Sequence, residues 1–213
     1  ADITGITTNE KLADQYASKC VLALPLVGFR SDVSVSIACT SATHTMNISG
    51  ASADSSESNF YSGSFVFDGS NDTVYTNAAN FSEFSFGSGD FTIEAWVNSD
   101  SSASKSIVSL WNYSANKRSW NLYLNSSQRV VLITSTNGTN QSDVVGPTAN
   151  TALPPNKWTH VAVTKESNTY RCFIDGVLKE SNSVTETLYN NTSDGVYIGS
   201  TNNATEYYDG HIQ

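Results

Sequence analysis

Apolar and polar residues alternate along much of this chain with the period of two that is typical of half-buried β-strands. In the stretch FTIEAWV (91–97), the first, third, fifth and seventh residues are apolar and are expected to face a core. The opposite side carries Glu94 next to Trp96, an unusual pair for a surface that only meets water. The pattern therefore predicts a strand with a second, partly covered face.

Two further stretches alternate in the same way. In WTHVAVTKE (158–166), the valines share one side, and the other side carries Trp158 and His160. In SWNLYLN (119–125), Trp120 and the two leucines share one side. Aromatic side chains thus recur on the side opposite the predicted core in the first two stretches.

Short apolar or alternating runs separated by turn-rich clusters recur along the chain, and no segment keeps a helical period over three turns. These runs predict strands at 19–27, 33–38, 44–48, 64–68, 73–76, 91–98, 106–111, 119–124, 129–135, 158–165, 170–174, 177–180 and 195–199. Asp175-Gly176 predicts a two-residue hairpin turn, because both residues tolerate positive φ.

This pattern predicts an all-β fold, an antiparallel sandwich of two sheets. Residues 1–15 are polar and weakly patterned, so we expect an N-terminal arm or linker there and one domain over residues 16–213. The apolar run at 20–29 is too short to span a bilayer, and we expect a buried strand bent at Pro25 rather than membrane insertion.

The composition of the chain limits the classes of partner that it is expected to bind. The 213-residue chain has a net charge of −9, and charged residues make up only 15% of it. An acidic surface without a basic patch repels phosphate backbones, which argues against nucleic-acid binding.

The three cysteines, Cys20, Cys39 and Cys172, have neither the number nor the spacing of a disulfide framework or a zinc site. We expect Cys20 and Cys172 to be small buried residues in strands. Whether Cys20 and Cys39 form a disulfide stays open.

Taken in order, eight stretches of the chain resemble the concanavalin A-like lectin/glucanase superfamily, in its laminin-G-like (pentraxin-like) jelly-roll branch. They are SGSFVFDGSNDTVYT (62–76), FSFGSGDFTIEAWVN (84–98), SIVSLWN (106–112), WNLYLN (120–125), KWTHVAVTK (157–165), YRCFIDGVLK (170–179), VYIGS (196–200) and YYDGHIQ (207–213). The resemblance implies a jelly-roll sandwich, and it is more specific to the fold than to any function.

Two departures from the family pattern matter. The G-x-I motif that opens a final strand in such domains falls here at 210–212, so we expect the domain to lack that final strand. The E-x-D-x-x-E strand of the glucanase branch is absent. A glycosidase needs two carboxylates within about 5–9.5 Å, whereas Asp90, the next acid on the side of Glu94, lies roughly 13 Å away at strand rise. We therefore predict no catalytic residues.

Sugar binding suits the residues better, because aromatic faces stack on sugar C–H faces while carboxylates and amides bond the hydroxyls. The candidate ligand-binding residues are Glu94, Trp96, Trp111, Tyr113, Trp158 and His160. In the competing interpretation a loop covers Trp96, and Glu94 bonds to loop amides or to His160.

Relatives of this branch often carry a structural calcium ion, and hard cations prefer clustered oxygen ligands. The candidate oxygen donors are Asp68, Asn71 and Asp72 in FDGSND (67–72) and Asp209 in YYDG (207–210). Ordinary turn chemistry is the competing explanation for these residues.

The start YASKCVLALPLVG and the end YYDGHIQ are similar in style to domains of structural proteins of marine phages and other aquatic viruses. This likeness implies a non-enzymatic, lectin-like module on a virion surface, as a capsid decoration or in a tail or fibre. Its N-terminal arm would contact other virion proteins, its face host glycans, and its copies would form a homo-oligomer or an array. The alternatives are a carbohydrate-binding module of a secreted bacterial enzyme or adhesin, and a degenerate glycoside hydrolase.

Overall fold

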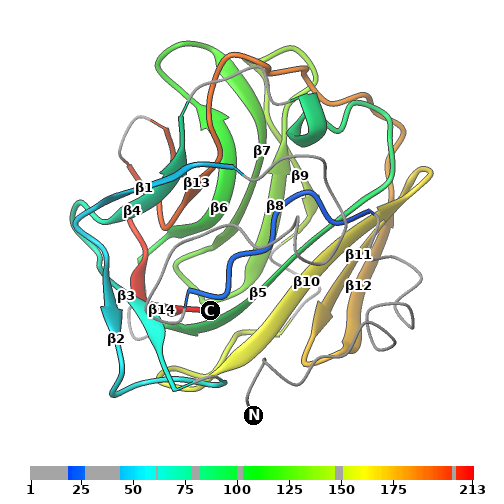
Figure 1. Ribbon diagram of the computed structural model, residues 1–213. Helices are drawn as coiled ribbons and strands as arrows, with labels where there is room; N and C mark the ends of the chain where they lie inside the picture. Colours follow the sequence, from blue (N-terminus) through cyan, green and yellow to red (C-terminus); the bar gives the residue numbers. More distant parts are fainter. Residues whose placement is uncertain are drawn as a thin grey trace, which may run out of the picture.

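The computed structural model describes residues 19–26, 44–60, 62–77, 82–99, 103–146, 151–202 and 205–213. Within these residues the chain forms two seven-stranded sheets, in which every pair of neighbouring strands is antiparallel (Figure 1). This confirms the predicted all-β sandwich. A single turn of 3-10 helix, Ser82–Phe84, is the one helical element of three or more residues in the described part.

The first sheet, called sheet A, has its strands in the order β1, β4, β13, β6, β7, β8 and β9. Their bounds are Met46–Ser49, Thr73–Thr76, Tyr197–Ile198, Lys105–Asn112, Lys117–Leu124, Val130–Thr134 and Ser142–Val145.

The second sheet, called sheet B, has the order β12, β11, β10, β5, β14, β3 and β2. Their bounds are Val177–Ser183, Thr169–Ile174, Thr159–Glu166, Phe91–Ser99, Asp209–Ile212, Ser64–Asp68 and Ser52–Asp54.

The core lies between the two sheets and is built by the predicted alternation. On β5, Phe91 and Val97 are buried, and Ile93 and Ala95 pack against the same cluster. The apolar side chains of β7 and of β10 that share one side also join it. Burying one such large side chain stabilises the fold by about 1.5–3 kcal/mol, so the alternation decides which side of each strand faces inward.

The turn at Asp175-Gly176 has the predicted form. Both residues have positive φ, 48° and 74°, and Ile174 pairs with Val177 across them. Two hydrogen bonds join Asp175 and His160: the Asp175 N–H donates to the His160 carbonyl, and the His160 N–H donates to the Asp175 side-chain carboxylate. The hairpin therefore anchors the start of β10.

The strand predicted at 19–27 is wrong in the part that the structure describes. Residues 19–26 form no strand, although Leu26 is 2% exposed and its apolar neighbours pack against the core. Pro25 has no N–H to donate to a ladder, and Leu26 turns the chain with φ 48°. Hydrophobic burial was correctly predicted for this segment, and ladder pairing was not. The strand predicted at 33–38 and Cys39 lie outside the described residues.

Three strands were not predicted as such: β2, β9 and β14. Residues Asp209–Ile212, where we expected the last strand only to begin, form β14 between β5 and β3 (red in Figure 1). Cys172 lies in β11 and is fully buried, as predicted, whereas the same prediction is wrong for Cys20, which is partly buried and lies in no strand.

Gly199 follows β13 at a point where only glycine fits. Its φ is +79°, and a Cβ there would lie 2.3 Å from the ring of Phe67. We expect Gly199→Ala to lower the free energy of unfolding by about 2–4 kcal/mol, the combined cost of left-handed backbone and overpacking. Urea unfolding measures this.

The matched control is Gly87→Ala. Gly87 also has positive φ, +56°, but nothing lies within 4 Å of the position that a Cβ would take there. It should cost only about 1 kcal/mol, the backbone part alone. Equal effects of the two substitutions would contradict the packing argument.

Candidate functional site

The outer face of sheet B brings together side chains from strands that are far apart in the sequence. Trp96 on β5 lies opposite His160 on β10, and Asn98 on β5 lies opposite His211 on β14. Since these pairs alternate with the core-facing residues, their side chains share the face that points away from the core.

An aromatic strip crosses this face. Phe60, in the connection between β2 and β3, contacts Trp96 edge to face, with ring centroids 5.1 Å apart at 85°. On the neighbouring strand β10, the ring of His160 has its centroid 5.2 Å from that of Trp96. Phe60 is 45% exposed, and Trp96 and His160 are partly exposed. The strip thus offers apolar ring surface to solvent.

Glu94 adds a negatively charged carboxylate next to the aromatic strip. Its Oε2 lies 3.4 Å from Nε2 of His160, and the Glu94 side chain is 63% exposed. The hydrogen bond with His160 lowers the pKa of Glu94 below its usual value. A carboxyl group of this kind stays ionised at neutral pH, so it accepts hydrogen bonds and does not serve as a proton donor.

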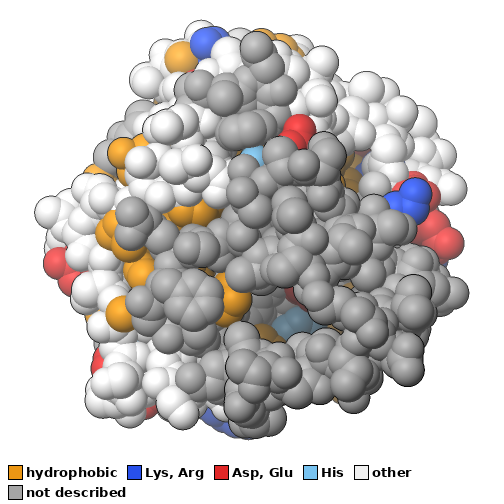
Figure 2. All heavy atoms as spheres, in the orientation of Figure 1, with side chains coloured by type: hydrophobic (Ala, Val, Ile, Leu, Met, Phe, Trp, Pro, Cys, Tyr) orange, Lys and Arg blue, Asp and Glu red, His pale blue; other side chains and the backbone are white. Residues whose placement is uncertain are grey.

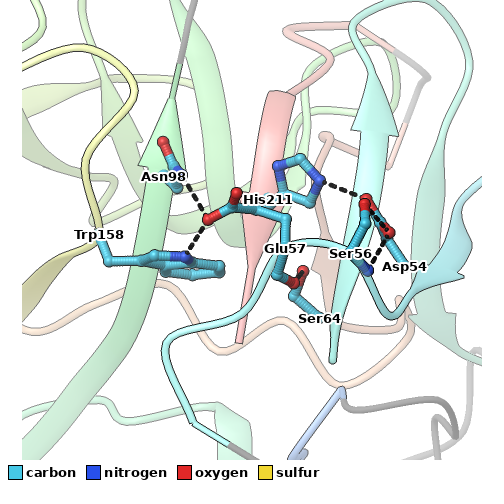
Figure 3. Close-up of polar contacts among 7 residues, drawn as sticks. All are labelled: Asp54, Ser56, Glu57, Ser64, Asn98, Trp158 and His211. Carbon is cyan, nitrogen blue, oxygen red and sulfur yellow. Dashed lines mark hydrogen bonds and ion pairs between the residues drawn. The ribbon is translucent and has the colours of Figure 1, made fainter. Parts of the chain in front are cut away.

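The connection between β2 and β3, called the strap (residues 55–63, of which Tyr61 is not described), runs across one part of this face. Oε1 of Glu57 accepts hydrogen bonds from Nε1 of Trp158 at 2.8 Å and from Nδ2 of Asn98 at 3.4 Å. Figure 3 shows these three side chains meeting from the strap, from β5 and from the residue before β10. Trp158 is therefore held against the strap by its indole N–H and is not a free stacking surface for a ligand.

A second tie holds the beginning of the strap. Nε2 of His211 lies 3.1 Å from Oδ2 of Asp54, whose Oδ1 accepts hydrogen bonds from the hydroxyl and the backbone N–H of Ser56 (Figure 3). Although a serine, a histidine and an aspartate meet here, the serine hydroxyl donates to the carboxylate. A nucleophilic triad instead needs the imidazole to bond to the serine.

A third tie comes from Gln213. Its Oε1 accepts hydrogen bonds from the N–H groups of Asn59 and Phe60, and its Nε2 donates to the carbonyls of Phe60 and Gly63. All the donors and acceptors of one amide are thereby used. Backbone bonds between Gln213 and Trp96 in both directions place this amide beside the strip.

Sequence reasoning found four members of this face: Glu94, Trp96, Trp158 and His160. It missed Phe60, Glu57, Asn98, His211 and Gln213. Asn98 continues the alternation of Glu94 and Trp96 on β5, so its signal was present in the sequence. The other four lie in the strap, in β14 or just after it, and these segments reach the face only through long-range pairing.

The other two candidate residues lie in sheet A and in the turn that follows one of its strands. Trp111 is in β6 and only 5% exposed, whereas Tyr113, in the turn that follows, is 58% exposed. The structure therefore separates them from the outer face of sheet B, and Trp111 cannot offer a ring face to a ligand without rearrangement.

The predicted calcium donors lie at one corner of the sandwich. Asp68 and Asp209 face each other across β3 and β14. Asp72 is 6% exposed, and burial raises its pKa, while its Oδ2 accepts the N–H of Asp68. Within the described residues, no group of three or more His, Cys, Asp or Glu side chains is placed to hold a metal ion. Calcium binding that also uses Asn71 or backbone oxygens stays a prediction.

A family model described as the concanavalin A-like lectin/glucanases superfamily (Laminin_G_3) matches residues 68–213. The chain belongs to this superfamily. The predicted family and fold are thus confirmed for this lectin-like domain. A comparison with curated proteins finds no match. Among the described residues, no helix is long and apolar enough to cross a membrane.

Three solved structures show the same fold at low identity. Domain 4 of AbnA, a GH43 extracellular arabinanase from Geobacillus stearothermophilus solved with arabinotriose, has a TM-score of 0.57 at 13% identity, covering 80% of this chain and 79% of that one. The binding domain of Paraclostridial Mosquitocidal Protein 1 has a TM-score of 0.66 at 14% identity, covering 93% and 49%.

The third is botulinum neurotoxin type C, whose cell entry depends on interaction with two ganglioside molecules. It has a TM-score of 0.64 at 18% identity, covering 87% of this chain and 43% of the toxin chain. The lectin-like domain thus spans about half the length of the last two structures. At such identities the likeness shows the fold.

The pKa of Asp54 is about 2, below its ordinary 3.8, because Ser56 donates two hydrogen bonds to it and His211 lies opposite. The unfolded chain takes up this proton near its ordinary pKa, so the stabilisation is present above about pH 4 and lost as the pH falls towards about 2. We expect wild type to be more stable than Asp54→Asn at about pH 6, and the difference to shrink below about pH 4. Chemical unfolding at several pH values measures this. A difference that is equal at pH 2 and pH 6 would rule the tie out.

Removing the Gln213 amide should release the strap. We expect Gln213→Ala to speed hydrogen exchange at the N–H groups of Asn59 and Phe60 by about tenfold, since both lose their acceptor. Gln213→Glu is the matched control, because it keeps the acceptor but removes the donors to Phe60 and Gly63. In Gln213→Glu, the N–H groups of Asn59 and Phe60 should exchange more slowly than in Gln213→Ala. Unchanged exchange in Gln213→Ala would contradict the assignment.

Proposed function

We propose that this domain is a non-enzymatic, lectin-like module that binds a neutral glycan on the outer face of sheet B. The observation that carries the proposal is the strip formed by Phe60, Trp96 and His160, with the ionised Glu94 beside it. Exposed ring surface suits the C–H face of a sugar, and the carboxylate suits its hydroxyls.

The charge of the protein favours a neutral ligand. The chain carries a net charge of −9, and the exposed polar group next to the strip is a carboxylate, so an acidic sugar would be repelled. On the face drawn in Figure 2, charged side chains are few and scattered over the described surface. Ring stacking, and hydrogen bonds of sugar hydroxyls with the Glu94 carboxylate and with uncharged groups, are then the available means of recognition.

We further propose a setting on a virion surface, as a decoration, tail or fibre module. The acidic surface, rich in Ser, Thr and Asn, suits a module that stays soluble at high local density. Arrayed copies would adhere to host glycans by avidity. The N-terminal arm (residues 1–15), proposed to contact other virion proteins, lies outside the described residues.

The second candidate is a carbohydrate-binding module of a secreted bacterial enzyme or adhesin. What favours it is the similarity to AbnA domain 4, which is part of an extracellular arabinanase and is covered over 79% of its length. Labelling of purified particles with an antibody to the domain separates the two settings: signal on particles supports the virion role, and signal only in a culture supernatant supports the secreted one.

A glycan array probed with the multimerised domain tests the binding proposal. We expect signal on neutral glycans, and a loss of about tenfold or more for Trp96→Ala, because the central ring of the strip disappears. Trp96→Phe is the control, since it keeps a smaller ring and should keep part of the signal. A calcium chelator in a parallel array tests whether a cation contributes.

Two outcomes would contradict the proposal. The first is no signal on any glycan from folded wild type, with or without calcium. The second is equal signal from wild type and Trp96→Ala, which would place any sugar site elsewhere on the domain.

A further inference from the structure

Tyr113 presents an aromatic ring to solvent far from the outer face of sheet B. It lies in the turn between β6 and β7 and is 58% exposed. The guanidinium carbon of Arg118 lies 3.9 Å from the centre of its ring. One side of the ring is therefore covered by the guanidinium, while more than half of the residue stays open.

The partner of this ring is itself held in place. Arg118 is 7% exposed, its NH1 donates to the carbonyl of Thr139, and its NH2 donates to Oδ1 of Asn116 at 3.2 Å. A guanidinium fixed by two hydrogen bonds holds the stacked ring in one orientation. Little side-chain freedom is then left for a ligand to freeze.

The loop between β8 and β9 supports the turn from the side. The N–H of Arg118 donates to the carbonyl of Gly138, and a Cβ on Gly138 would lie 2.4 Å from the carbonyl oxygen of Asn116. Only glycine permits so close an approach. The two connections therefore form one packed unit.

The two connections of this packed unit are rich in neutral hydrogen-bonding groups. Exposed hydroxyl and amide side chains of the two connections are those of Ser114, Asn116, Thr136, Asn137, Thr139 and Asn140. A fixed ring on a unit rich in exposed hydroxyls and amides has the composition of a sugar-binding surface, in which stacking and neutral hydrogen bonds act together.

We infer that Tyr113 is the stacking platform of a second glycan contact, on the sheet opposite the first. β6 and β7 belong to sheet A, whereas β5 and β10, which carry Trp96 and His160, belong to sheet B (Figure 1). This inference rests on the proposed glycan-binding function. Two contacts on opposite sheets allow one domain to bridge two chains of a polysaccharide, or two glycans on a surface.

Affinity gel electrophoresis tests both sites with soluble neutral polysaccharides, namely arabinan, galactomannan, β-glucan and starch, cast in the gel. The variants are Trp96→Ala, Tyr113→Ala and the double substitution, with Tyr113→Phe as the matched control that keeps the ring. Melting temperatures check that each variant is folded. We expect each single alanine variant to bind at least about fivefold more weakly, the double variant to lose retardation, and Tyr113→Phe to stay within about twofold of wild type.

The outcomes separate the two proposals. If Tyr113→Ala is retarded like wild type while Trp96→Ala is not retarded, the second contact is refuted and the first stands. If only Tyr113→Ala loses retardation, the contact at Tyr113 stands and the site on sheet B falls. If folded wild type is not retarded by any of the four polysaccharides, both proposals fall.

Discussion

The pairing of β14 on both sides is the constraint on which the rest of sheet B depends. Residues Asp209–Ile212 bond to β3 on one side and to β5 on the other. Without this strand, the order of sheet B would break between β5 and β3, and the strap would lose its neighbours. The same insertion places His211 beside Asn98 and sets Gln213 beside Trp96. One short strand therefore closes the sheet, and together with the residue that follows it supplies two of the three ties of the candidate site.

Polar ties, rather than apolar packing, shape the outer face of sheet B. Three sets of polar contacts hold the strap on this face. They are the contact of Asp54 with His211, the hydrogen bonds of Glu57 with Trp158 and Asn98, and those of the Gln213 amide. A hydrogen-bonded amide with every donor and acceptor in use fixes geometry more sharply than a contact between apolar side chains. This explains how Phe60 and Trp96 stay partly exposed and yet keep one relative orientation.

The two ring surfaces of the domain are held by different means. In sheet B, Phe60 and His160 flank Trp96, so ring–ring contacts order the strip. In the turn between β6 and β7, the ring of Tyr113 packs against the buried Arg118, so a cation orders a single ring. Both arrangements reduce the entropy that a weakly binding ligand must remove. That reduction matters most for sugars, whose individual contacts are weak and whose binding gains from repetition.

The sequence by itself determined which residues face the core. The alternation at 91–97 and at 158–166, and the turn at Asp175-Gly176, follow from side-chain period and local backbone preference, which act within a few residues. Only the tertiary structure decided the membership of the site. Three features depend on contacts between distant segments. They are the bond that holds Trp158 to the strap, the separation of Tyr113 from Trp96, and the absence of a strand at residues 19–26. Such pairing is chosen by the packing of the whole sandwich, and no local pattern encodes it.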